Sequence, residues 1–97
     1  MFSTDKRIEE TTFKGLSVQK IFISQTAETL LISLEKDHDF PEHTSPRDAL
    51  LVMMEGKIIF RIKGTDYSLD CRDSFTFPAN EPHMVHAEEN SKFLIIR

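Results

Sequence analysis

This 97-residue chain has few of the features that mark disulfide-bonded, membrane-spanning or nucleic-acid-binding proteins. Its single cysteine, Cys71, cannot form a disulfide within the chain, and no catalytic motif surrounds it. No apolar stretch approaches the roughly 20 residues that a membrane-spanning helix needs, and the first residues lack the apolar core of a signal peptide. We therefore expect a cytoplasmic protein without a membrane partner.

An excess of positive charge is also missing. Twelve lysine and arginine residues against sixteen aspartate and glutamate residues give a net charge of −4, and no basic cluster occurs. Because phosphate groups are bound by basic surfaces, this balance argues against a nucleic-acid partner.

Helical periodicity is absent as well, and strand signals take its place. Apolar residues alternate or cluster in short segments that end at glycine, proline or aspartate. We expect strands over residues 16–24, 29–35, 49–54, 57–63, 84–88 and 93–96, with shorter apolar pairs at 67–69 and 75–77. This spacing is typical of an all-β sandwich or barrel, and the length fits one domain with one modest core.

Polar residues, prolines and glycines predict where the domain and its strands begin and end. Residues 1–15 are mostly polar and read as an arm or a first edge strand, so that residues 16–97 form the single barrel domain. We expect a loop over 36–46, because Pro41 and Pro46 cannot occupy central positions of a sheet. The segment 49–54 is apolar at every position, which predicts a strand buried on both faces. Hairpin turns are expected at Gly56 and Gly64.

Two histidines stand beside prolines, forty residues apart. One lies in residues 41–46 (PEHTSP) and the other ends residues 78–83 (PANEPH). Both lie at the edges of expected strands, so His43 and His83 can face each other inside a small barrel. Such a pair is a candidate site for a metal ion or a small ligand.

The same segments resemble the cupins, a family of small double-stranded β-helix or jelly-roll barrels. Residues 41–56 (PEHTSPRDALLVMMEG) resemble the first cupin motif, and 71–73 (CRD) with 77–83 (FPANEPH) resemble the second. The similarity covers residues 34–96. It implies a cupin-type barrel, usually an oligomer, and we expect a homodimer in which residues 1–15 or the following strand cover a sheet edge.

The resemblance also shows where ligands are missing. Metal-binding cupins usually supply three histidines and one glutamate. Here His43 and His83 are present, but Ser45 stands at the second histidine position and Ala49, or Leu50 with a shift of one residue, at the glutamate position. Glycine positions of the motif are occupied by Asn80 and Arg72. The resemblance therefore implies a cupin that keeps two of four ligands.

The histidine pair admits two interpretations. The residues can bind a divalent transition metal (Zn, Fe, Ni or Mn) together with an unusual third ligand, or they can be pocket histidines hydrogen-bonded to each other, to Ser45 or to water. Ser45 shares a face with His43, whereas alternation turns His86 away from His83. Phe60, Phe75 and Phe77 form an aromatic stripe that packs in the core or lines the mouth of a ligand-binding barrel.

Three functions follow. The first is a small cupin-barrel protein that binds a metal ion, a small molecule or both through His43 and His83. The second is a metal-dependent enzyme, of dioxygenase or isomerase type, that acts on a small metabolite. The third is a ligand-sensing or interaction domain.

Overall fold

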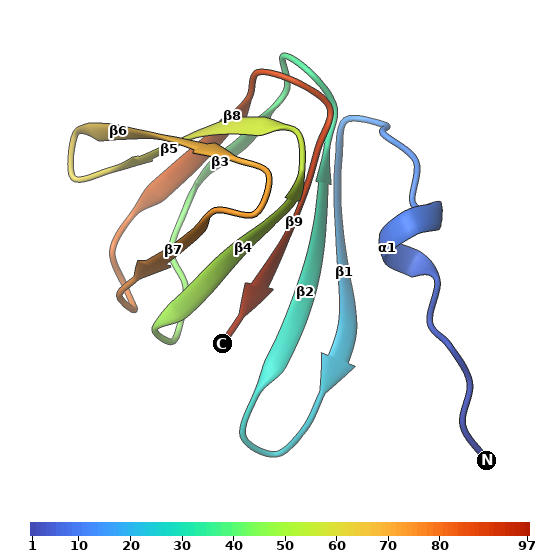
Figure 1. Cartoon of the computed structure of the whole chain (residues 1–97). Coiled ribbons are helices and arrows are strands. Elements are labelled where there is room, and N and C mark those ends of the chain that lie inside the picture. The colour runs from blue at the N-terminus through green and yellow to red at the C-terminus, as the bar shows by residue number, and fades with distance from the viewer.

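The computed structural model describes residues 1–97 and consists almost entirely of strands (Figure 1). Its elements in chain order are α1 (Arg7–Glu10), β1 (Leu16–Ile23), β2 (Glu28–Leu34), β3 (Asp39–His43), β4 (Ala49–Glu55), β5 (Lys57–Ile62), β6 (Thr65–Asp70), β7 (Ser74–Phe77), β8 (His83–Ala87) and β9 (Ser91–Ile96). The expected all-β fold is confirmed. The single helix has four residues, and no helix has the length and apolar character to cross a membrane.

The strands form two antiparallel sheets that face each other (Figure 1). One sheet has the order β1-β2-β9-β4-β7, and the other has the order β3-β8-β5-β6. Every ladder joins strands within one sheet, so the molecule is a jelly-roll sandwich whose rim is not closed by hydrogen bonds. The edge strands are β1 and β7 in the larger sheet, and β3 and β6 in the smaller.

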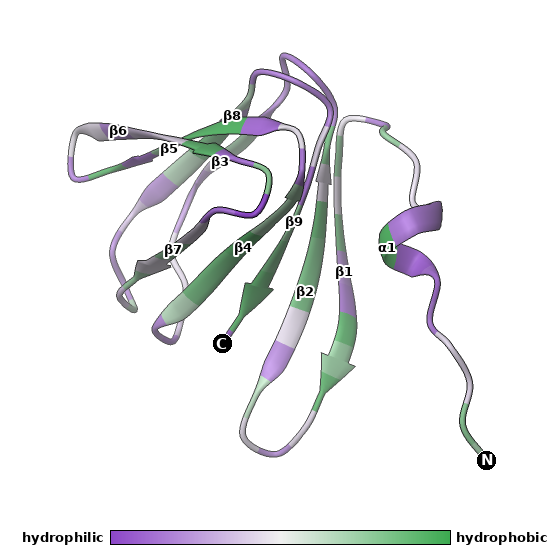
Figure 2. Cartoon of the chain, viewed as in Figure 1, coloured by the Kyte–Doolittle hydropathy of each residue, from purple (hydrophilic) through white to green (hydrophobic).

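The core fills the space between the sheets because strand residues alternate between its two faces. In β5, the alternate residues Ile58, Phe60 and Ile62 are buried. Figure 2 shows the hydrophobic colour concentrated on the strands and the hydrophilic colour on the turns. Fifteen buried side chains form one continuous cluster: Leu30, Ile32, Leu34, Ala49, Leu51, Met53, Ile58, Phe60, Ile62, Leu69, Phe77, Val85, Ala87, Phe93 and Ile95.

The prediction that residues 49–54 are buried on both faces is wrong. Ala49, Leu51 and Met53 point into the core, but Leu50 and Met54 on the other face of β4 are 36% and 38% exposed. The outer face is covered only further along the sheet, over β2 and β9, where Ser33 and Lys92 bond to residues of the N-terminal segment. Apolar sequence alone therefore overestimated the burial of β4.

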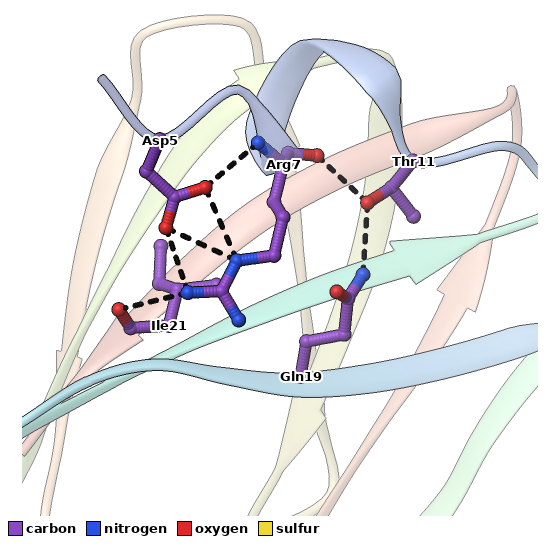
Figure 3. Close-up of polar contacts among 5 residues, drawn as sticks. All are labelled: Asp5, Arg7, Thr11, Gln19 and Ile21. Atoms are coloured by element: carbon purple, nitrogen blue, oxygen red, sulfur yellow. Dashed lines mark hydrogen bonds and ion pairs between the residues drawn. The ribbon is translucent and has the colours of Figure 1, made fainter. Parts of the chain in front are cut away.

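The N-terminal segment, residues 1–15, contains no strand and crosses the outer face of the larger sheet (Figure 1). Figure 3 shows its attachment to β1. Arg7 forms a salt bridge with Asp5, in which its Nε and Nη2 both donate to the carboxylate, and its Nη2 also donates a hydrogen bond of 3.3 Å to the carbonyl oxygen of Ile21. The side-chain amide of Gln19 donates to the hydroxyl of Thr11 at 2.8 Å.

A buried lysine anchors the same segment to β9. The side chain of Lys92 is 3% exposed, and its Nζ donates to the carbonyl oxygens of Ile8 and Glu9 at 2.8 and 3.1 Å. The ammonium also lies 5.0 Å from the ring centroid of Phe13. The carbonyl groups at the C-terminal end of a helix lack partners within the helix, so the ammonium satisfies them and stabilises α1 on the sheet.

Tight turns connect the strands at residues with positive φ. Gly56 has φ +85° between β4 and β5. The expected turn is present, but the expected hairpin is wrong, because β4 and β5 belong to different sheets and do not pair. Lys63 and Gly64, at φ 51° and 74°, form the two-residue turn of the β5-β6 hairpin. Asn80 and Arg72, at the positions where the resemblance implies glycine, take φ 65° and 73°. Both residues thus adopt the left-handed conformation although side chains disfavour it.

Candidate functional site

His43 lies on a strand and not in a loop. The predicted loop over 36–46 is wrong for Asp39–His43, which forms β3 and pairs with β8. Proline is disfavoured at central positions of a sheet, but β3 is an edge strand, so Pro41 can lack an N–H group without breaking a ladder on its free side.

A β-bulge in β3 determines which side chains reach the interior. Phe40 pairs with Val85 and His43 pairs with His83, so three steps on β3 match two steps on β8. Regular alternation would place Phe40 and His43 on opposite faces, but the extra residue turns both inward. Their rings stack at 4.0 Å with an interplanar angle of 13°. Sequence reasoning missed Phe40, because period-two alternation gives no sign of a bulge.

His83 begins β8 directly opposite His43 and is only 4% exposed. The two imidazole centroids lie 4.3 Å apart at an angle of 64°. His83 also stacks on Phe60 at 5.3 Å and contacts Phe77 at 4.5 Å. His86 points to the outer face, where its Nδ1 contacts a carboxylate oxygen of Asp39 at 2.6 Å, as strand alternation predicts.

Both imidazoles have a defined proton position. Nδ1 of His43 lies 2.7 Å from the carbonyl oxygen of Pro41, and Nδ1 of His83 lies 2.9 Å from that of Glu81. A carbonyl oxygen only accepts, so each Nδ1 carries the hydrogen and Nε2 is the unprotonated nitrogen of the neutral ring. Burial lowers the pKa of His83 below its ordinary value of 6.5, and the nearby His43 and Arg97 lower it further. The hydrogen bond with the carbonyl oxygen of Glu81 raises the pKa, but the lowering effects are larger.

Ser45 is buried beside the histidines, but its hydroxyl is already used by the protein. It donates to the carbonyl oxygen of Arg47 at 2.7 Å and accepts from the backbone N–H of Arg47 at 3.4 Å and from Nη1 of Arg97 at 3.2 Å. One donor and two acceptor positions are the full capacity of a hydroxyl. Ser45 therefore fixes the turn after β3 and holds Arg97, and it offers no free group to a ligand.

A cavity of about 220 Å³ opens between the sheets at the histidine pair. Nine of its fifteen lining residues are hydrophobic, and none is aspartate or glutamate. They are Val18, Leu30, Ile32, Phe40, His43, Thr44, Ser45, Pro46, Phe60, Phe77, His83, Val85, Phe93, Ile95 and Arg97.

Only two of the three phenylalanines in the aromatic stripe line this cavity. Phe60 and Phe77 belong to its wall. Phe75 does not: it is partly buried behind Phe60, at a centroid distance of 4.8 Å, and contacts Tyr67 at 5.0 Å. The structure thus places Phe75 among the packing residues behind the wall.

Arg97 is the second site residue that sequence reasoning missed. It follows β9, and its backbone forms a reciprocal pair with Glu28, with N···O distances of 3.0 and 2.7 Å. Its Nε donates to a carboxylate oxygen of Glu28 at 2.7 Å. A charged residue just after an apolar strand usually reaches solvent, so only the position of β2 beside β9 reveals that this side chain turns into the cavity mouth.

The donor atoms do not fit a first-row metal ion. No group of three or more histidine, cysteine, aspartate or glutamate side chains comes together in the chain. The two imidazoles are short of the three protein ligands that such sites normally have. Ala49 is buried without a donor atom, and the carboxylate of Asp48 accepts a hydrogen bond from the backbone N–H of Ala79 at 2.9 Å. The guanidinium of Arg97 adds a positive charge that opposes a cation.

Comparison with known proteins gives a consistent result. A family model described as a cupin domain matches residues 30–96. An RmlC-like cupin protein from Desulfovibrio desulfuricans has a TM-score of 0.86 at 17% identity, covering 99% of this chain and 95% of its own. A cupin superfamily protein from Desulfitobacterium hafniense has a TM-score of 0.80 at 18% identity over 90% and 80% of the two chains.

A third structure is more similar in sequence and larger. The cupin 2 conserved barrel domain protein from Leptotrichia buccalis is 26% identical, with a TM-score of 0.82 over 93% of this chain and 44% of its own. No curated protein matches the chain in sequence.

Proposed function

We propose, from the premise that this chain belongs to the cupin family, that it binds a small organic molecule between its two sheets, with His43 and His83 as the polar contacts. The family match covers 67 of 97 residues, from 30 to 96. Family membership gives the fold, and the side chains of this particular cavity support the function.

The proposal depends on the unprotonated nitrogens of the two histidines. Each Nδ1–H is held by a backbone carbonyl, so each ring presents Nε2 as a hydrogen-bond acceptor. The surrounding wall is mostly hydrophobic. An apolar cavity with a few convergent polar groups is the usual form of a small-molecule site. The matching chemistry is an apolar body that carries an O–H or N–H group facing the histidines.

The size of the cavity limits the ligand. About 220 Å³ is below the ~300–1,000 Å³ of pockets that take drug-sized molecules. A metabolite with a single ring or a short branched chain fits this space.

Metal-dependent chemistry has weaker support in this chain. The backbone carbonyls that orient His43 and His83 are partners that metal-bound histidines also use. The donor set nevertheless ends at two imidazoles, and Ser45, at the position of another ligand, has no free lone pair. We therefore propose ligand binding without a resident metal.

Two sets of variants test this proposal. Thermal shift and calorimetry with mandelate, mandelamide, benzyl alcohol and lactate measure binding, and metal analysis is done on protein purified without chelator or metal-binding tag. We expect at least one probe to bind and no stoichiometric metal to be present. The double variant His43→Ala, His83→Ala should lose the binding, whereas His38→Ala, His86→Ala should retain it, because both of these histidines lie outside the cavity wall.

Two results would contradict the proposal. Near-stoichiometric metal that disappears in the His43, His83 variant would favour the metal-dependent enzyme. Binding that survives in this variant would show that the histidines are not the polar contacts.

A further inference from the structure

The cavity mouth holds one cationic side chain that is fixed in place before any ligand arrives. The Arg97 side chain is 19% exposed. Its backbone is paired with Glu28, its Nε donates to the Glu28 carboxylate at 2.7 Å, and its Nη1 donates to Ser45 at 3.2 Å. Binding to a side chain that is already ordered loses less conformational entropy.

Most of the hydrogen-bonding capacity of Arg97 is still free. A guanidinium has five N–H donors in a planar fork. One N–H of Nε and one of Nη1 have protein acceptors, so three remain, including both on Nη2. A carboxylate or phosphate group is the acceptor that matches this fork in shape and charge.

Two cationic side chains share one side-chain carboxylate beside the cavity mouth. Nε of Arg97 pairs with one oxygen of Glu28, and the other oxygen of that carboxylate lies 3.3 Å from Nζ of Lys20. The carboxylate of Glu28 therefore divides its charge between Arg97 and Lys20. No acidic residue lines the cavity to repel an anion.

The apolar wall selects an organic anion. Phosphate alone would leave the hydrophobic side chains beyond Arg97 unmatched, and a doubly charged phosphate ester would bring more charge than one guanidinium balances. A carboxylate brings a single charge, and its apolar body can cover the wall formed by residues such as Phe60 and Phe93.

We propose that the ligand is a small hydroxycarboxylate with an apolar body: its carboxylate binds the guanidinium of Arg97, and its hydroxyl donates to a histidine Nε2. This inference rests on the proposed function and adds the chemical class of the ligand and its anchoring residue.

Matched probes separate the two ends of the ligand. Mandelate carries the ring, the hydroxyl and the carboxylate; mandelamide lacks the charge, phenylacetate lacks the hydroxyl, and benzyl alcohol lacks the carboxylate. We expect mandelate to bind more tightly than mandelamide by about tenfold or more, the effect of losing a charge-assisted hydrogen bond. Phenylacetate should bind more weakly than mandelate and keep its dependence on Arg97.

Three variants test the anchor. Arg97→Gln should weaken mandelate binding by about tenfold or more and leave benzyl alcohol binding unchanged. Arg97→Lys keeps the charge and the contact with Glu28 but removes the fork, and it should give an intermediate loss. Arg61→Gln is the matched control: it removes the same charge from an exposed arginine that pairs with Asp66 and lies outside the cavity wall, so it should bind as the wild type does.

The outcomes distinguish the two proposals. Equal binding of mandelate and mandelamide, or full mandelate affinity in folded Arg97→Gln, would overturn the carboxylate anchor while leaving the histidine site intact. If Arg97→Gln fails to fold, the comparison of mandelate with mandelamide on the wild-type protein decides, and equal binding of the two overturns the carboxylate anchor. No binding of any probe by the wild type at millimolar concentration would overturn both proposals.

Discussion

Replacing Gly56 with alanine should cost about 3 kcal/mol of unfolding free energy, because two penalties act together. The residue has φ +85°, and an L side chain in this region costs about 1–2 kcal/mol. The new methyl would also lie 2.3 Å from the carbonyl oxygen of Asn90 and 2.7 Å from Cα of Ser91, and such overpacking costs about 1–3 kcal/mol. The lower entropy of the unfolded chain returns about 0.4–1 kcal/mol.

Gly64 provides the matched control. Its φ of +74° carries the same backbone penalty, but nothing lies within 4 Å of an added Cβ. Gly64→Ala should therefore cost about 1 kcal/mol, and the difference between the variants isolates the collision with residues 90 and 91. Urea unfolding followed by far-UV circular dichroism measures both values. Equal losses would refute the reasoning, since they would mean that the backbone at Asn90 moves aside at no cost.

Three further predictions concern ionisation, anchoring and assembly. Burial lowers the pKa of His83 in the folded protein, so at pH values below the ordinary pKa of 6.5 the unfolded state binds more protons than the folded state. The free energy of unfolding of the wild type should therefore fall as the pH drops below 6.5. Urea titrations of a His83→Gln variant should show a flatter dependence on pH. Lys92→Met should lower the free energy of unfolding by about 1–3 kcal/mol and speed tryptic cleavage within residues 1–15. Lys63→Met, at an exposed lysine, should change the free energy of unfolding by less than about 0.5 kcal/mol. Equal effects of the two substitutions would contradict the anchoring role of Lys92. Light scattering should give the mass of a dimer of the 11.2 kDa chain, since edge strand β1 leaves Val18 and Phe22 about half exposed. Phe22→Lys should give a monomer. A monomeric wild type would rule out the dimer.

Much of the fold could be predicted because strand alternation is a local property. The pattern of residues 57–63 was enough to place Ile58, Phe60 and Ile62 on the buried face. The glycines at 56 and 64 marked turns, because those conformations favour residues without a side chain. These signals lie within a few residues of the feature they predict.

The candidate site was predictable only in part. The prolines and motifs around His43 and His83 indicated a facing pair, and the structure brings their rings within 4.3 Å. The bulge that turns Phe40 inward left no trace in the sequence, because it depends on how β3 aligns with β8. The same is true of β4, whose apolar outer face is left partly exposed because the N-terminal segment covers other strands.

The sequence by itself determined the all-β class, the turns and the presence of Ser45 and Ala49 where histidine or glutamate would be a metal ligand by resemblance to the cupins, because each of these depends on residue type at one position or on a short repeat. Only the tertiary structure decided that Arg97 lines the same cavity as the two histidines. Glu28 and Ser45 hold Arg97 across separations of 69 and 52 residues, so its place at the cavity mouth exists only after β2, β9 and the turn before β4 have come together.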